Sequence, residues 1–162
     1  GLHAKVLTYG NPTGGYEIQN QIRASTGLDI TPVRSEETHL EAVEWMRAGG
    51  VVITAVDRPI RRKAHTLTFF DHPSPLPAGH IRMALEARVP VLVVAAHRTP
   101  DRQYHIKLSA PIVMQRLKDK ELEIRQNAEK VLTAIETFIR EAPEQWLMYY
   151  PVWPDLIVNQ KL

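Results

Sequence analysis

The chain has 162 residues, of which 44% are hydrophobic and 23% charged, a composition that is ordinary for one soluble globular domain with a core of its own. It contains no cysteine, which excludes disulfides, thiolate metal sites and thiol catalysis. The net charge is only +2, and no run approaches the roughly 18 consecutive apolar residues that a membrane-spanning helix needs.

Short apolar runs alternate with amphipathic segments along the chain, and Gly10, Gly27 and Gly49 punctuate them. Strands are predicted at residues 4–9, 28–33, 51–56, 66–70, 89–96 and 104–108. Helices are predicted at residues 15–26 with Thr13 as N-cap, after Ser35, at residues 78–88 and at residues 120–141. This order predicts a single α/β domain over residues 1–162, with a mainly parallel sheet flanked by helices. Because the first strand starts almost at residue 1, we expect the sheet to be incomplete at its N-terminus.

Two predicted strands, at residues 51–56 and 89–96, are continuous apolar runs, the pattern of strands buried on both faces of a sheet. Asp57 and Arg58 directly follow the first run, and His97 and Arg98 lie at the end of the second. Side chains at the carboxyl ends of parallel strands commonly line a ligand crevice. All four are therefore candidate binding residues, although Asp57 and Arg58 fit equally well as a local ion pair that ends a strand.

Two further segments are suited to anions. The helix opened by Ala78 and Gly79 can present backbone N–H groups to a phosphate, or it is an ordinary helix start after a proline. The basic cluster of Arg61, Arg62 and Lys63 can hold the chain against anionic lipid, or it is a solvated loop.

The chain ends in an aromatic tail instead of a polar one, with Trp146, Tyr149, Tyr150 and Trp153 close together. Tryptophan and tyrosine favour the headgroup depth of a membrane, so the tail can be an interfacial belt. It can equally be a hydrophobic clasp that packs the C-terminus onto the body of the protein.

A further hypothesis is a metal-dependent hydrolase, because several histidines lie near Asp71 or Asp101 in the sequence. These histidines are His65, His72, His80, His97 and His105. Their spacing matches no helical pair of metal ligands, so we predict no metal site. Only His39 with Glu44 has the HxxxxE spacing of a histidine base and an orienting acid, and five residues along a helix place two side chains well apart around its axis.

Four segments occur together in one order along the chain. They are NQIRASTG with Arg23 and Gly27, GGVVITAVDR with Asp57 and Arg58, FFDHPSPLPAG with Phe69, Phe70 and Gly79, and PEQW ending at Trp146. The ensemble resembles the C-terminal portion of the lysophospholipid acyltransferase superfamily, in the branch of the lipid A late acyltransferases (lauroyl and myristoyl acyltransferases) and the phosphatidylinositol mannoside acyltransferases. The chain departs from that pattern at Asp71, where the family usually has glycine, and after Trp146, where basic residues are usual.

The resemblance implies a glycerol-3-phosphate acyltransferase-like fold and transfer of a fatty acyl group from acyl-CoA or acyl carrier protein to a hydroxyl of a glycolipid or phospholipid precursor. The implied substrate-binding residues are Arg23, Asp57, Arg58, Phe69, Phe70, Gly79, His97 and Arg98. The family's catalytic HxxxxD or HxxxxE motif lies upstream of all these segments. We therefore expect this chain to supply acceptor-side and acyl-groove residues, to contain no catalytic residue, and to be inactive alone.

The same resemblance implies no bound cofactor, a thioester co-substrate, a lipid acceptor and a peripheral location at the cytoplasmic face of the inner membrane. Nucleic acid is not an expected partner, because the basic residues lack interleaved aromatics. The alternative hypothesis is that the chain is a non-catalytic lipid- or anion-binding module of the same fold. An incomplete sheet also predicts an exposed apolar face that favours self-association.

Overall fold

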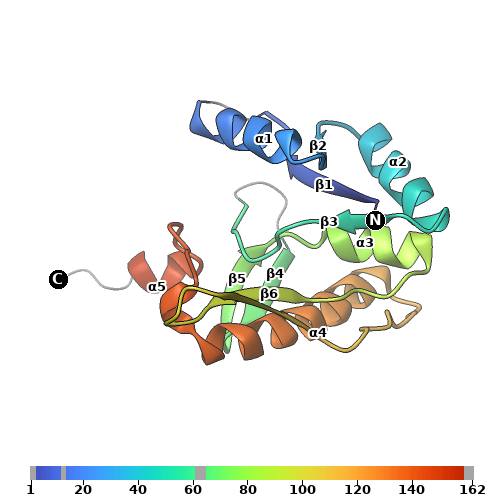
Figure 1. The fold of residues 1–162 in the computed structure, drawn as a ribbon. Helices are drawn as coiled ribbons and strands as arrows, with labels where there is room; N and C mark the ends of the chain where they lie inside the picture. Colours follow the sequence, from blue (N-terminus) through green and yellow to red (C-terminus); the bar gives the residue numbers. More distant parts are fainter. Residues whose placement is uncertain (1–2, 12–13, 61–64, 159–162) are drawn as a thin grey trace. The chain divides into compact units, whose positions relative to one another are not determined.

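The computed structural model describes residues 3–11, 14–60 and 65–158. The chain divides into two compact units: a first unit of Gly1–Ala55 with Met83–Val89, and a second unit of Val56–Arg82 with Pro90–Leu162. The boundary between them passes through helix α3 (Gly79–Ala87). The described residues contain both helices and strands, which confirms the mixed α/β class (Figure 1).

The first unit is built on a parallel sheet in the order β2-β1-β3. Its strands are β1 (Ala4–Tyr9), β2 (Asp29–Val33) and β3 (Val51–Ile53), and helices α1 (Gly15–Ser25) and α2 (Glu36–Arg47) connect them. Strand β3 is shorter than the predicted 51–56 and is not fully buried, because it pairs only with β1 and the pairing ends at Ile53. Thr13, the predicted N-cap of α1, lies outside the described residues, and Gly14 occupies the cap position.

The core of the first unit lies between α2 and the C-terminal half of α3. Ala42 and Val43 pack with Met83 and Ala87, all at most 8% exposed. Half-buried side chains of the strands and helix ends surround them: Leu7, Met46, Val52 and Val89. The amphipathic face expected of α2 therefore meets an apolar face of α3.

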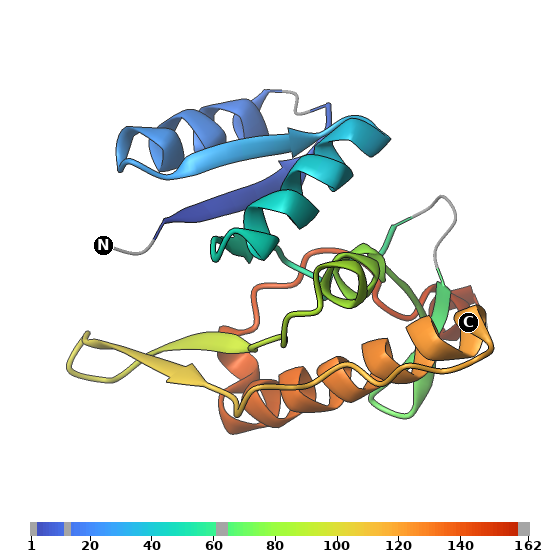
Figure 2. The ribbon, with the colours of Figure 1, turned by 90° about the vertical axis from the view of Figure 1, so that its right-hand side faces the viewer.

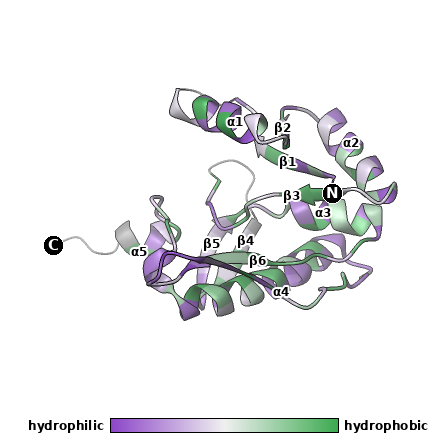
Figure 3. Cartoon of the chain, viewed as in Figure 1, coloured by the Kyte–Doolittle hydropathy of each residue, from purple (hydrophilic) through white to green (hydrophobic). Residues whose placement is uncertain are grey.

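The second unit consists of two antiparallel hairpins, a long helix and a C-terminal tail. Hairpin β4–β5 joins His65–Phe69 to His72–Leu76, and hairpin β6–β7 joins Val94–Arg98 to Tyr104–Leu108. Helix α4 (Lys120–Glu141) packs on β4 and is followed by the short 3-10 helix η1 (Pro143–Gln145) and by α5 (Pro154–Val158). Hydrophobic and hydrophilic residues both occur along α4, as expected of an amphipathic helix (Figure 3).

The prediction of a mainly parallel sheet is therefore wrong in extent. Within the described residues the parallel sheet has three strands, and β4 to β7 are antiparallel. The predicted buried strand at 89–96 is also wrong, because only Val94–Arg98 forms a strand and its residues are alternately exposed and half-buried. One face of β6 is open to solvent, so the apolar run that precedes it does not mark a doubly covered strand.

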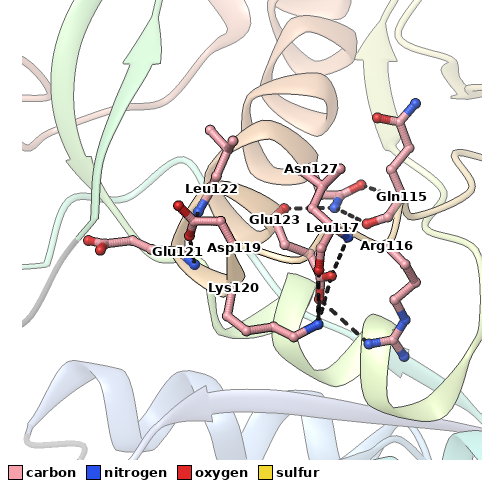
Figure 4. Close-up of polar contacts among 9 residues, drawn as sticks. All are labelled: Gln115, Arg116, Leu117, Asp119, Lys120, Glu121, Leu122, Glu123 and Asn127. Carbon is pink, nitrogen blue, oxygen red and sulfur yellow. Dashed lines mark hydrogen bonds and ion pairs between the residues drawn. The ribbon is translucent and has the colours of Figure 1, made fainter.

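A polar network at the start of α4 fixes the preceding segment onto the helix (Figure 4). Glu123, 2% exposed, accepts hydrogen bonds from the backbone N–H of Leu117 at 2.6 Å and from Lys120 Nζ at 3.0 Å. Asn127 exchanges two hydrogen bonds with the backbone of Gln115, at 2.7 and 2.8 Å. The partners of these buried polar groups include backbone groups of residues 115–117, which form neither a helix nor a strand. The hydrogen bonds therefore fix the path of that segment.

Candidate functional site

Four aromatic rings form a cluster in the second unit. Phe69 ends β4, Phe70 begins the turn after it, and Trp146 and Trp153 come from the C-terminal tail. The Phe69 ring centroid lies 4.8 Å from that of Phe70, 5.9 Å from that of Trp146 and 6.0 Å from that of Trp153. Edge-to-face and stacked contacts at these distances are favourable for aromatic rings. The tail is thereby packed against the β4–β5 hairpin.

Two hydrogen bonds tie the tail to the same hairpin. Trp153 Nε1 donates to the carbonyl of Phe69 at 2.9 Å. The buried Ser74 hydroxyl, on β5, donates to the carbonyl of Val152. The tail therefore acts as a clasp in this structure, and Trp146 and Trp153 are half-buried within it.

The turn between β4 and β5 holds a bulky residue in a left-handed conformation. Phe70 has φ 50° and Asp71 has φ 62°, the sign pattern of a two-residue type I′ hairpin turn. The N–H of Phe70 donates to Glu136 Oε1 at 2.7 Å, and the Arg140 guanidinium lies 4.6 Å from the centre of its ring. The Asp71 position, which departs from the family's glycine, is thus the second residue of a tight turn that keeps Phe70 in the cluster.

Asp57 and Arg58, which lie far from the tail in the sequence, contact two of its aromatic residues. Trp146 Nε1 donates to Asp57 Oδ2 at 2.8 Å, and the Arg58 guanidinium lies 4.0 Å from the centre of the Tyr150 ring. Asp57 and Arg58 thus each have their own aromatic partner. A cation above an aromatic face is electrostatically favourable and leaves guanidinium N–H groups available to an anion.

A pocket of about 290 Å³ opens beside these groups, near the lower limit of about 300 Å³ for small-molecule sites. It is lined by Trp146, Met148, Tyr150, Pro151, Val152, Trp153 and Leu156. We call it the aromatic pocket. Its walls are mostly apolar, and two of its lining residues hold Asp57 and Arg58, so it suits an apolar chain that carries a polar or anionic group.

The structure brings together four of the predicted site residues, namely Asp57, Arg58, Phe69 and Phe70. Sequence reasoning placed Trp146, Tyr150 and Trp153 in the tail without linking them to Asp57 or Arg58. It did not single out Pro151, Val152 and Leu156 as lining residues. The available signal was the replacement of the family's basic residues by Met148, Tyr149 and Tyr150.

His97 and Arg98 lie elsewhere in the second unit and not at the end of a parallel strand. The prediction of their position is wrong, because β6 belongs to an antiparallel hairpin. Gln145 Nε2 donates to the carbonyl of Arg98 at 3.0 Å, and Arg98 N–H donates to Gln145 Oε1 at 2.7 Å. His97 Nδ1 lies 4.0 Å from Glu141 Oε2, so these contacts join β6 to the end of α4 and to η1.

Gly79 and Arg23 also have defined surroundings. Gly79 is the first residue of α3, and a Cβ there would meet no atom within 4 Å, so crowding does not require glycine. Arg23 belongs to α1 in the first unit, where it donates to Asn20 Oδ1 at 3.3 Å and lies 6.0 Å from the centre of the Tyr16 ring. The basic cluster of Arg61, Arg62 and Lys63 lies outside the described residues.

The HxxxxE pair does not form a dyad. His39 Nε2 lies 2.8 Å from Glu86 Oε2 on α3, whereas Glu44 accepts from Arg47 one turn further along α2. The structure agrees with the helical geometry, which separates residues five apart by about 140° around the axis.

Within the described residues, no three histidine, aspartate or glutamate side chains converge as metal ligands would. In that same part of the chain, no helix combines the length and apolar character needed to cross a bilayer.

A model of the bacterial lipid A biosynthesis acyltransferase family matches residues 8–154, nearly the whole chain. The α/β fold and the apolar pocket therefore belong to a protein of the acyltransferase class. More closely, the chain belongs to the bacterial lipid A biosynthesis acyltransferase family, which confirms the resemblance seen in its motifs. None of the curated proteins compared with the chain matches it.

Proposed function

We propose that the chain takes part in moving a fatty acyl group from acyl-CoA or acyl carrier protein to a hydroxyl of a glycolipid or phospholipid precursor, at the cytoplasmic face of the inner membrane. The observation that carries this proposal is the aromatic pocket, in which Trp146 holds Asp57 and Tyr150 holds Arg58. The apolar walls would take the acyl chain, and the Arg58 guanidinium would meet an anionic group of donor or acceptor.

In this reaction the acceptor hydroxyl attacks the thioester carbonyl. A C–O bond forms and the C–S bond breaks, and a general base takes the hydroxyl proton and passes it to the departing sulfur, which leaves as a thiol. We assign acyl binding to the aromatic pocket and acceptor recognition to Asp57 and Arg58, which belong to the same unit as the pocket. We assign the base to none of the described residues, because the partners of His39 and Glu44 are Glu86 and Arg47.

A fluorescence titration tests the binding step. Of the three tryptophans, Trp146 and Trp153 line the pocket and Trp45 lies in the first unit. Adding lauroyl-CoA or myristoyl-CoA to the Trp45→Phe variant should change the emission of the two remaining tryptophans in a saturable way. Coenzyme A alone should change it much less. Equal responses to both compounds would contradict an acyl-binding role.

Transfer itself is tested on the protein at its native length, because none of the described residues is assigned as the base, with a radiolabelled acyl thioester and a lipid A precursor as acceptor and chromatography of the lipid product. Product formed by the wild-type protein and reduced at least tenfold by the Asp57→Ala change would support the acyl-transfer proposal, because Asp57 is assigned to the acceptor side. Wild-type turnover that the Asp57→Ala chain matches would overturn that assignment.

The alternative function is a non-catalytic lipid- or anion-binding module. It is favoured by one observation, the separation of His39 from Glu44, the sole pair with the family's catalytic spacing in this sequence. Saturable binding of the acyl thioester by the native-length protein, without any labelled lipid product, would select this module over the acyltransferase.

A further inference from the structure

The β6–β7 hairpin has two unlike faces. Direct cross-strand pairs put Val94 with Leu108, Ala96 with Ile106 and Arg98 with Tyr104 on one face. The pairs on the other face are Ala95 with Lys107 and His97 with His105. We call the first of these the apolar ribbon face.

The second face is tied to α4, which leaves the apolar ribbon face as the outer one. Lys107 Nζ donates to Glu141 Oε2 at 2.6 Å, and His97 Nδ1 lies 4.0 Å from the same oxygen. Both residues belong to the second face. In the view of Figure 2 the hairpin, drawn in yellow, extends past the C-terminal end of α4.

The apolar ribbon face is open to solvent although most of it is hydrophobic. Val94 is 60% exposed, Ile106 67%, Leu108 61% and Tyr104 70%. Four large side chains side by side on one face of a strand pair form a contiguous patch, which a monomeric soluble protein rarely leaves uncovered without a binding role.

The charge on and beside this face is positive. Arg98 shares the face with Tyr104, and Arg102 lies in the turn that joins the strands. Within the described residues, neither guanidinium has an ion-pair or hydrogen-bond partner. Asp101 is the one acid in the sequence of residues 94–108, and it already accepts a hydrogen bond from the Thr99 hydroxyl.

We propose that the apolar ribbon face is the surface by which this protein lies on an anionic lipid membrane. Aliphatic side chains would enter the acyl boundary, Tyr104 would lie at headgroup depth, and Arg98 and Arg102 would meet lipid phosphates. The inference rests on the proposed membrane location and names the surface responsible for it.

Charge favours lipid over a second copy of this chain as the occupant. Two apposed ribbon faces would enclose four arginines with only the two Asp101 carboxylates nearby, and burying unpaired cations is costly. An anionic bilayer supplies a phosphate for each guanidinium and an apolar interior for the aliphatic residues.

The test is co-sedimentation of the full chain with vesicles of phosphatidylethanolamine and phosphatidylglycerol, compared with vesicles of phosphatidylcholine alone. Ile106→Glu should weaken binding to the anionic vesicles about tenfold or more, because a charge replaces an inserted apolar group. Ile22→Glu is the matched control, because Ile22 is an isoleucine of the first unit with a similar exposure of 62%. Arg98→Gln with Arg102→Gln should abolish the preference for anionic vesicles.

Three results would overturn the proposal. The two glutamate variants could bind vesicles equally well, or the wild-type chain could bind neutral and anionic vesicles alike. Sedimentation equilibrium could also show a wild-type dimer that Ile106→Glu dissociates, which would make a second copy the occupant. Acyl-CoA titration of the Ile106→Glu variant separates the two proposals, because the aromatic pocket should still respond when vesicle binding is lost.

Discussion

Phe70 occupies a backbone conformation that bulky residues normally avoid, at φ 50°. A left-handed residue of this kind costs about 1–2 kcal/mol, so its neighbours must offset that cost. They do so with the hydrogen bond from its N–H to Glu136 and with contacts to three aromatic rings and to Arg140. Backbone strain concentrates at binding sites, and here it holds the Phe70 ring against Trp146 and Trp153, two residues that line the aromatic pocket.

Asp71→Gly is expected to stabilise the protein by about 1 kcal/mol, because glycine is the preferred second residue of a type I′ turn and Asp71 has φ 62°. Urea unfolding followed by circular dichroism measures the change. Asp101→Gly is the control, because Asp101 lies in the other hairpin turn and accepts a hydrogen bond from Thr99. A stabilisation of equal size at Asp101 would show that the φ value of Asp71 is not the cause.

Trp146→Phe is expected to lower the free energy of unfolding by about 1–3 kcal/mol, because it removes the donor to a half-buried carboxylate. Trp153→Phe removes a bond to a neutral carbonyl and should cost about 1 kcal/mol. Both tryptophans line the aromatic pocket, so both changes should weaken acyl-CoA binding, but only Trp146→Phe should also weaken binding of the lipid acceptor, because it removes the donor that holds Asp57. An equal loss of acceptor affinity in both variants would point to general loosening of the tail.

At the scale of elements, the start of α4 depends on a buried carboxylate. The backbone N–H of Leu117 and then the Lys120 ammonium lower the pKa of Glu123 from its ordinary value of 4.5. A lowered folded-state pKa means that Glu123 stabilises the fold above about pH 4.5 and that this contribution is lost as the pH falls below that value.

Glu123→Gln should therefore reduce the urea midpoint at pH 7 and flatten its decline below pH 4.5. Glu121→Gln is the matched control, because Glu121 is exposed on the same helical turn and points away from the network in Figure 4. If the urea midpoints of the Glu123→Gln variant and the wild type decline in parallel as the pH falls, the Glu123 carboxylate does not make stability depend on pH.

The sequence predicts the long helices well because their apolar spacing is local information. Strand β5 was not predicted, because prolines such as Pro73 and Pro75 are unfavourable within a strand. The structure accommodates both, since residues two apart in a strand point their N–H groups to the same side, and here that side faces away from β4. The outward carbonyl of Pro75 accepts a hydrogen bond from Ile60 N–H at 3.0 Å, which agrees with this orientation.

The candidate site was predictable only in part, for a related reason. The end of an apolar run marked Asp57, but its donor is Trp146, which lies 89 residues away. Nothing in local periodicity specifies such a distant partner. The error at His97 and Arg98 has the same origin, because whether an apolar run is covered on both faces depends on neighbours that the sequence pattern does not name.

At the scale of the whole molecule, the response to acid should begin with His80. Both ring nitrogens are buried and have no hydrogen-bond partner within the described residues. Burial lowers the pKa of His80 from 6.5 to about 4. As the pH falls from 6.5 to 4, the unfolded chain gains a proton that the folded chain does not, so about 3 kcal/mol of stability is lost across that window.

His80→Leu should remove most of that loss, because leucine is apolar and does not titrate. The measurement is the urea midpoint at pH values between 7 and 4 in the Trp45→Phe background, where both remaining tryptophans report unfolding of the second unit, to which His80 belongs. His105→Leu, at an exposed position on β7, should leave the profile unchanged. If His80→Leu declines as steeply as the wild type over this window, acid sensitivity arises elsewhere, and the carboxylates of Glu123 and Glu141, whose lowered pKa values act below pH 4.5, become the next groups to test.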